Sequence, residues 1–442
     1  MKIFLCIFVF IGLTFSAFSA NEWLYYKHYP WVWDYKNQDW LYLRGASDGK
    51  IYSYNHSTKT WVEFKNYVLT WEEQYEEWIK NPEPYGGLDT LLLIKISKQN
   101  NYTEINFLSD TNISDLTPLA GLTNLTSLRL SKNNITDLTP LTNLTKLTFL
   151  DLSFNKIVEL PSLANLTNLT DLRLNNNQIA DLTPLANLTK LTDLNIFISD
   201  NNISDLTPLA SLINLNSLHL QRNNISDLHA LSGLSNLNVL YLDGNDVRDL
   251  SPLENLMNLS NISLSRNSIS DLTTLNKLTS LAVLDLSYNK IVDLTPIITL
   301  NKLTSLDLYR NNISDITPLS LMTNLSGLKL SYNDITSIEP LTNLTNLTTL
   351  YINQNKVENL TPLAGLTNLR HLNISTHLLL DLTPLSGLTN LTDIWALFFP
   401  NNKYIDLSPL AGLTKLRTAW FSGQDLDLAP LLGLENLKIN LN

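Results

Sequence analysis

The sequence predicts an α/β solenoid, with short parallel strands on one face of the stack and short helices or turns on the other. A sequence repeat of 22 residues recurs about fifteen times between roughly Asn112 and Leu434. Within the repeat the apolar positions follow the spacing L-x-x-L-x-L-x-x-N-x-I, as in residues 125–146. A unit of this size buries its leucines only against neighbouring units, so the units must stack.

This period and spacing are the signature of leucine-rich repeats, which form a horseshoe with a parallel sheet on the concave face. A solenoid grows by adding turns and is not limited by one globular core. The length of 442 residues is therefore no indication of several enzymatic domains.

Residues 1–19 have the composition of a secretory signal peptide. Lys2 precedes an apolar run over residues 3–15, and small residues follow it up to Ser19. The apolar run is shorter than a membrane span, which disfavours the alternative of an N-terminal anchor and predicts no transmembrane span in the mature chain. Cys6 is the only cysteine, so the exported chain would hold no disulfide. We expect a secreted or cell-surface protein, with the periplasm as the other destination.

Residues 20–66 are rich in Trp and Tyr and nearly free of the leucine period. Alternating aromatics around the Asp48-Gly49 turn predict β-hairpins in a small meander of four or five strands. The aromatic spacing resembles short repeats of bacterial surface proteins, some of which bind cell-wall sugars or choline. That resemblance implies an alternative function, cell-wall or glycan binding, through Trp31, Trp33 and Trp40. Packing of a small core is the other reason for these aromatics to be present.

Residues 67–102 are predicted to cap the first turn of the solenoid. Thr70 and Glu73 form a capping box that opens a helix, and Asn81-Pro82 ends it. An apolar segment over residues 91–96 follows. Because the first turn would otherwise expose its core edge, we assign this region to the N-terminal cap.

Residues 103–442 form the repeat domain. In one turn, Leu150 and Leu152 have the period of two that is expected of a short strand. An asparagine then recurs in each turn, and its amide can pair backbone groups that face inward where the strand ends. We interpret this column as structural; its members are Asn133, Asn155, Asn177, Asn201, Asn223, Asn245, Asn267, Asn289, Asn311, Asn333 and Asn355.

The second half of each turn carries Asp-Leu-Thr-Pro-Leu, as in residues 181–185. Proline after threonine suits the first turn of a short helix on the convex side. The aligned aspartates raise the alternative of a calcium site, but a row of carboxylates does not converge on one ion and no D-x-D-x-D-G loop is present. We therefore expect a solvated acidic column.

The sequence from Asp181 to Leu194, DLTPLANLTKLTDL, is similar to the repeats of the internalin class of bacterial leucine-rich repeat proteins. The similarity extends over residues 112–434. This resemblance implies that the concave face binds another protein. Cytosolic phosphatase regulators share the 22-residue turn, but the N-terminal segment argues against that compartment.

The composition narrows the class of partner. A formal charge of −11 and a pI near 5.0 oppose binding to nucleic acid or anionic membranes and favour neutral or basic partners. The six histidines belong to no H-E-x-x-H motif, and neither G-x-S-x-G nor a Gly-rich phosphate loop occurs. We therefore predict a non-enzymatic protein without cofactor or metal.

Partner recognition is expected at positions that vary within the repeat. One variable column, in the middle of the strands, reads Arg129, Asp151, Arg173, Asn195, His219, Tyr241, Ser263, Asp285, Asp307, Lys329, Tyr351, Asn373 and Trp395. A second, just before the asparagine column, alternates Arg and Tyr over residues 266–332. Arg and Tyr are enriched at binding hot spots, although a self-stacked stripe without a partner is the alternative.

The predicted partner-binding residues come from both columns and from Tyr309 beside them: Arg222, Tyr241, Arg266, Tyr288, Tyr309, Arg310, Tyr332, Tyr351 and Trp395. The period also slips at residues 195–200, at His377 and at residues 394–404. Such insertions form loops, which are functional in some repeat proteins and mere drift in others.

Overall fold

We analysed a computed structural model of the chain. It describes residues 31–34, 39–45, 51–55, 60–63, 70–191, 196–375, 381–397, 405–422 and 426–441. The chain divides into two compact units, residues 1–74 and 75–442, each of which is described by itself. The predicted signal peptide lies outside the described residues, as do the side chains of residues 20–66.

The first unit contains a four-stranded antiparallel meander. Its strands pair in chain order, with Val32 opposite Leu41 and Ser53 opposite Val62. This confirms the predicted β module before the repeats. The strands are β1 (Trp31–Asp34), β2 (Asp39–Gly45), β3 (Ile51–Asn55) and β4 (Thr60–Glu63).

The predicted capping box opens helix α2 (Trp71–Trp78). The Thr70 N–H donates to Glu73 Oε2 over 3.0 Å, and the Glu73 N–H donates to Thr70 Oγ1 over 3.2 Å. These reciprocal bonds pair donors that a helix N-terminus leaves without an intrahelical partner.

A helical cap covers the first repeat. Helix α3 (Leu88–Gln99), which follows the short 3-10 helix η2 (Glu83–Tyr85), buries Leu91 and Ile94. The Pro84 carbonyl accepts the N–H groups of Ser114 and Asp115 over 2.8 and 2.9 Å, which fastens the cap to the first turn. The predicted N-terminal cap is therefore present.

In the described part of the chain the repeats form one parallel sheet of sixteen strands in chain order. Neighbouring strands are in register at the repeat period, so that Leu128, Leu150 and Leu172 are aligned and fully buried. The strands are β5 (Glu104–Ile105), β6 (Ser127–Arg129), β7 (Phe149–Asp151), β8 (Asp171–Arg173), β9 (Ile196–Phe197), β10 (Ser217–His219), β11 (Val239–Tyr241), β12 (Asn261–Ser263), β13 (Val283–Asp285), β14 (Ser305–Asp307), β15 (Gly327–Lys329), β16 (Thr349–Tyr351), β17 (His371–Asn373), β18 (Asp393–Leu397), β19 (Thr418–Ser422) and β20 (Lys438–Leu441).

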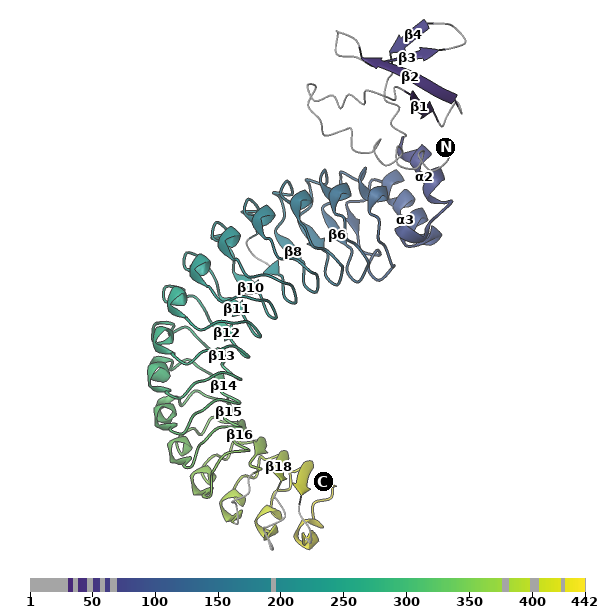
Figure 1. The fold of residues 1–442 in the computed structure, drawn as a ribbon. Coiled ribbons are helices and arrows are strands. Elements are labelled where there is room, and N and C mark those ends of the chain that lie inside the picture. Colours follow the sequence, from purple (N-terminus) through teal and green to yellow (C-terminus); the bar gives the residue numbers. More distant parts are fainter. Residues whose placement is uncertain are drawn as a thin grey trace. The chain divides into compact units, whose positions relative to one another are not determined.

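Short 3-10 helices lie opposite the strands in the repeats, and Figure 1 shows the strands on the inner, concave side of the stack. They are η3 (Thr117–Leu119), η4 (Thr139–Leu141), η5 (Pro161–Leu163), η6 (Thr183–Leu185), η7 (Thr207–Leu209), η8 (His229–Leu231), η9 (Ser251–Leu253), η10 (Thr273–Lys277), η11 (Thr295–Thr299), η12 (Thr317–Leu321), η13 (Glu339–Leu341), η14 (Thr361–Leu363), η15 (Thr383–Leu385), η16 (Ser408–Leu410) and η17 (Ala429–Leu431). The proline after threonine occupies the start of most of them, as predicted.

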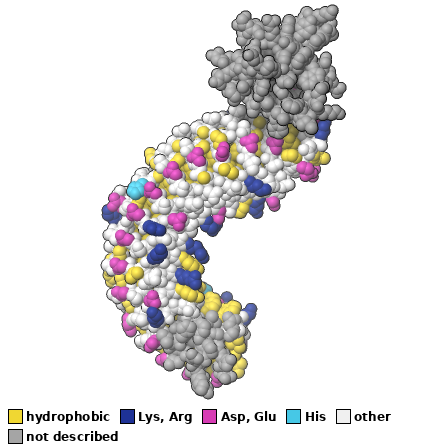
Figure 2. Space-filling view, in the orientation of Figure 1, with side chains coloured by type: hydrophobic (Ala, Val, Ile, Leu, Met, Phe, Trp, Pro, Cys, Tyr) yellow, Lys and Arg dark blue, Asp and Glu magenta, His cyan; other side chains and the backbone are white. Residues whose placement is uncertain are grey.

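The acidic column caps these helices. Asp293 Oδ1 accepts the Thr295 N–H over 2.8 Å, and Asp181 and Asp315 make the same bond to Thr183 and Thr317. The expected solvated column is exposed, as Figure 2 shows along the outer edge of the repeats, but it also pairs helix N–H groups. The N-cap position is a leucine, Leu182 in η6 and Leu294 in η11, and makes no side-chain cap bond, so the aspartate supplies the cap.

The asparagine column bridges successive turns. Asn311 Oδ1 accepts the Ile291 N–H of the preceding turn over 3.0 Å, and its Nδ2 donates to the Leu286 and Leu308 carbonyls over 3.0 and 3.2 Å. The same set of bonds recurs at the other members, for example at Asn289. This confirms the structural interpretation of the column, and no buried side-chain nitrogen or oxygen among the described residues lacks a hydrogen bond.

Candidate recognition surface

The middle of each strand presents the first variable column to solvent. In β14, Leu306 is buried while Ser305 and Asp307 on either side of it are exposed or half-exposed, because side chains alternate across a strand. One predicted member was wrong. The register aligns Phe197, not Asn195, with Arg173 and His219, because the two extra residues of this turn precede β9.

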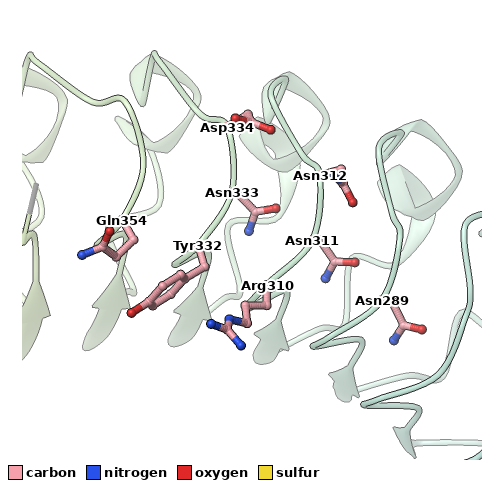
Figure 3. A pocket seen from close by; sticks show the side chains of 8 residues that line it. All are labelled: Asn289, Arg310, Asn311, Asn312, Tyr332, Asn333, Asp334 and Gln354. Carbon is pink, nitrogen blue, oxygen red and sulfur yellow. The ribbon is translucent and has the colours of Figure 1, made fainter.

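The second variable column lies just after the strands, where the backbone turns. Its members have positive φ, between 52° and 58° at Arg222, Arg266, Tyr288, Arg310 and Tyr332. Figure 3 shows Arg310, Tyr332 and Gln354 at the edge of the sheet, next to the asparagine column. The arginines and tyrosines of this second column therefore lie along the sheet edge and not in the middle of the concave face.

Four side chains of this column, Arg266, Tyr288, Arg310 and Tyr332, form a stack that we call the Arg–Tyr ladder. The Arg266 guanidinium lies 4.0 Å from the Tyr288 ring centroid, and that of Arg310 lies 5.4 Å from Tyr288 and 5.0 Å from Tyr332. Both arginines are exposed, and Tyr332 keeps 38% of its surface accessible. The predicted alternation thus forms a chain of cation–π contacts on the surface.

Tyr309 joins the ladder from the second position after β14. Its ring centroid lies 5.1 Å from that of Tyr288 and 5.2 Å from that of Tyr332. Burial raises the pKa of its phenol, and the neighbouring Tyr288 raises it further. The Tyr309 phenol therefore stays neutral near neutral pH and can donate a hydrogen bond.

The other predicted residues fall into separate groups. Arg222 is held by Asp200, with Nη2 donating to Oδ2 over 2.6 Å. Tyr241 packs against His219, with ring centroids 4.7 Å apart, and Tyr351 packs against Trp395 at 6.0 Å. The nine predicted residues do not form one continuous patch; five of them cluster around the ladder.

The structure adds aromatic residues that sequence reasoning missed. Phe149 and Phe197 stack with arginines in the first half of the sheet: Arg129 lies 4.5 Å from the Phe149 ring, and Arg173 lies 5.4 Å from that of Phe197. Trp420 is paired in register with Trp395 on the adjoining strands β19 and β18. Counting back from the buried leucine position of each strand would have found Phe197 and Trp420.

Burial shifts the pKa of two groups in the middle of the strands. His219 lies against Phe197 at 4.3 Å, and burial lowers its pKa to about 4. Burial raises the pKa of Asp285, whose carboxylate accepts the Ser287 N–H over 2.8 Å. His219 is therefore neutral at physiological pH, and this part of the face is aromatic without added charge.

An open hollow of about 430 Å³ adjoins the ladder on the side of the asparagine column. Figure 3 shows its walls, which combine one cation, one phenol, one carboxylate and several amides. The lining residues are Asn289, Arg310, Asn311, Asn312, Tyr332, Asn333, Asp334 and Gln354. Such a polar wall suits hydrogen bonding to a charged or polar group.

No cluster of three or more His, Cys, Asp or Glu that could hold a metal ion occurs in the described ranges. His371 pairs with Asp393 over 2.8 Å, whereas His28, His56 and His377 lie outside those ranges. No described helix is both long and apolar enough to cross a membrane. The insertions at residues 376–380 and 398–404 also lie outside the described part of the chain.

Comparison with known proteins supports the fold and the family. The family described as leucine-rich repeats in two copies matches residues 123–165, 145–187, 167–211, 279–321 and 323–365. A search among curated proteins gave no match. Among solved structures, an internalin from Listeria monocytogenes is 37% identical, with a TM-score of 0.64, and the alignment covers 66% of this chain and 86% of that one.

Two more distant structures share the fold. A leucine-rich repeat protein from Leptospira interrogans is 22% identical, with a TM-score of 0.66, and covers 83% of this chain and 98% of its own. A plant peptide hormone receptor, solved in complex with its peptide, is 20% identical with a TM-score of 0.54, and covers 76% of this chain and 66% of its own. Together with the repeat match and the aligned leucine and asparagine columns, the 37% identity shows that the chain belongs to the internalin family of leucine-rich repeat proteins.

Proposed function

We propose that this chain is an exported recognition protein that binds a partner protein along the concave sheet and its edge, with the Arg–Tyr ladder at the centre of the contact. Leucine-rich repeat proteins such as internalins mediate protein–protein interaction, which gives the general class. The ladder is the observation that carries the specific proposal, because exposed arginine and tyrosine side chains are held in place before any partner arrives.

Preorganisation makes the ladder a favourable contact. Immobilising a flexible side chain on binding costs about 0.5–1.5 kcal/mol, and stacking on Tyr288 and Tyr332 restricts Arg310 in advance. Arg and Tyr are also the residue types that dominate binding energy at interfaces. Stability alone does not require the ladder, since the asparagine column and the buried leucines already join the turns.

Export and contact with a host or neighbouring cell are part of the proposal. They rest on the signal-like sequence of residues 1–19 and on a composition that leaves Cys6 as the only cysteine. The plant receptor of the same fold is solved with a bound peptide, which supports a peptide or protein as the class of ligand. No catalytic step is proposed.

Site-specific photo-crosslinking tests the location of the contact. A photoreactive phenylalanine at Gln354, in the same column as the ladder, should capture a partner protein from intact target cells. The same group at Leu321, 65% exposed at the end of η12 on the opposite face, is the matched control. Equal capture at both positions, or capture that survives Tyr288→Ala with Tyr332→Ala, would contradict the proposal.

A second candidate function is cell-wall or glycan binding through the first unit. Trp31, Trp33 and Trp40 lie on two paired strands of the meander, with Trp33 opposite Trp40 in the register. Sedimentation with isolated cell walls would compare the full chain with Trp33→Ala and with Tyr288→Ala. Loss of sedimentation only in Trp33→Ala would favour this function, and loss in neither would exclude both residues from cell-wall binding.

A further inference from the structure

The two arginines of the Arg–Tyr ladder have no carboxylate partner among the residues that the structure describes. In the part of the chain that the structure describes, neither Arg266 nor Arg310 forms an ion pair or donates a side-chain hydrogen bond, although the formal charge is −11. Other cations nearby are paired: Arg222 with Asp200, Lys329 with Asp307 over 2.7 Å, and Lys356 with Asp334 over 2.7 Å. The two unpaired guanidiniums lie two turns apart in the same column. They give this edge of an acidic chain a local excess of positive charge.

The stacking leaves the donors of these arginines available. A guanidinium that lies over a ring uses its flat face, while its five N–H donors point outward in its plane. The Arg310 guanidinium lies 5.4 Å from the Tyr288 ring centroid and 5.0 Å from that of Tyr332, and these contacts hold it beside the hollow that it lines. Such a rigid fork matches the two oxygens of a carboxylate.

The hollow beside Arg310 completes a site for an anion. Asn312 and Gln354 line it, and neither side chain is engaged in a hydrogen bond within the described residues. Tyr332 adds a phenol. The one carboxylate in the wall, Asp334, accepts from Lys356 Nζ and its charge is balanced there. An incoming anion therefore meets donors and no uncompensated negative charge.

The same geometry disfavours a sugar ring. Recognition of a sugar by an aromatic side chain uses an open ring face. Tyr288 has the guanidinium of Arg266 from the preceding turn and that of Arg310 from the following turn against its ring. Tyr332 makes a T-shaped ring contact with Tyr309, with centroids 5.2 Å apart, and the guanidinium of Arg310 lies 5.0 Å from its ring centroid. Because these ring faces are occupied, they favour a partner side chain that accepts hydrogen bonds from the arginine N–H groups.

We infer that the hollow takes the carboxylate of an aspartate or glutamate from the partner protein, with Arg310 as the bidentate donor. This rests on the proposed function and names the chemistry of the partner segment that reaches the ladder. The overall acidity favours neutral or basic partners, but only the local charge at the edge acts on a contact of this size, because salt screens exposed charges beyond about 8–10 Å.

Selection from a random peptide display library on the full exported chain provides the test. Peptides whose binding depends on Tyr288 and Tyr332 should carry an acidic residue. Arg310→Gln should weaken them about 10- to 100-fold, as expected for a hydrogen bond to a charged group. Replacing the acidic peptide residue by its amide should cause the same loss, and combining both changes should cause little more.

Arg248→Gln is the matched control, because Arg248 is an exposed arginine that lies outside both variable columns. It should change binding by less than about twofold. Arg310→Lys should give an intermediate loss, since lysine keeps the charge but not the fork. Circular dichroism of each variant checks that the repeat fold is retained.

The outcomes separate this inference from the proposed function. Ladder-dependent peptides without acidic residues would overturn the carboxylate inference and leave protein recognition by the ladder standing. Binding of polygalacturonate with the same dependence on Arg310, without acidic peptides, would overturn it in favour of an acidic polysaccharide. Selection of peptides that depend on no ladder residue would overturn both.

Discussion

The guanidinium of Arg310 lies 5.0 Å from the ring centroid of Tyr332, and the two residues come from neighbouring turns of the solenoid. The contact spans the repeat period, since an arginine and a tyrosine 22 residues apart in the chain occupy the same place in successive turns. It adds a cation–π contact between turns to the backbone bonds that already join them.

A double-mutant cycle should measure this contact. Arg310→Ala and Tyr332→Ala are each expected to lower the free energy of unfolding modestly, and their coupling should be about 0.5–1 kcal/mol, the range for an exposed cation–π pair. Urea unfolding of the wild type, both single variants and the double variant gives the coupling. A coupling near zero would show that the two side chains do not interact in solution.

The asparagine column should behave as structure, not as a binding surface. Asn289 is 8% exposed and pairs four backbone groups, so Asn289→Ala should lower the free energy of unfolding by about 1–3 kcal/mol through groups left unpaired. Asn312→Ala is the control, because that side chain is exposed. Thermal unfolding that is equally affected by both changes would contradict the role assigned to the column.

The leucine, asparagine and Thr-Pro columns could be predicted from the sequence because each is fixed by the period. The alternation of Arg266, Tyr288, Arg310 and Tyr332 was also predictable, since identical offsets stack in a solenoid. Their location at the sheet edge was not, because positive φ is a property of the turn and not of Arg or Tyr. Gly244 in the same column, with φ of 65°, was the available signal.

The placement of Phe197 could not be settled by counting forward. Two extra residues enter this turn, and the sequence permits them on either side of β9. The structure places the extra residues before β9. This register buries Ile198 in the core and puts Asn201 in the asparagine column, where its Nδ2 donates to the Leu174 carbonyl over 3.0 Å. Burial and hydrogen bonding of the later residues therefore decide the register.

The aspartate caps should make stability depend on acid. Hydrogen bonds from the threonine hydroxyl and N–H lower the pKa of Asp271, Asp293 and Asp315 below 3.8. The unfolded chain then binds more protons in this range, so the contribution of the caps is present above that value and is lost as the pH falls through the folded pKa values.

Replacing these three aspartates together by asparagine tests whether the caps make the protein less stable as the pH falls. Asn359 already caps Thr361 in this way over 2.9 Å, so the N–H bonds should survive and stability near neutral pH should change little. The urea midpoint of the triple variant should then fall less than that of the wild type between about pH 5 and pH 3. If the urea midpoints of the two proteins fell by the same amount over this pH range, the caps would not contribute to acid sensitivity.

His219 should give a separate loss of stability at milder acidity. Its ring lies between Phe197 and Tyr241, and burial lowers its pKa from 6.5 to about 4. The unfolded state therefore binds more protons between these two values, and stability falls as the pH falls from about 6.5 to about 4. Discounted for the partial exposure of the ring, the loss should be about 1–2 kcal/mol.

His219→Phe keeps an aromatic ring in the stack and removes the titration. The variant and the wild type should differ little in unfolding free energy at about pH 7.5, and the variant should be the more stable at about pH 4.5. The bond between His219 Nε2 and Ser217 Oγ, 3.0 Å long, is lost in the variant at both pH values and so does not alter the slope. An NMR titration that places the pKa of His219 near 6.5 in the folded chain would overturn this expectation, because burial would then exert no net effect on the charged form.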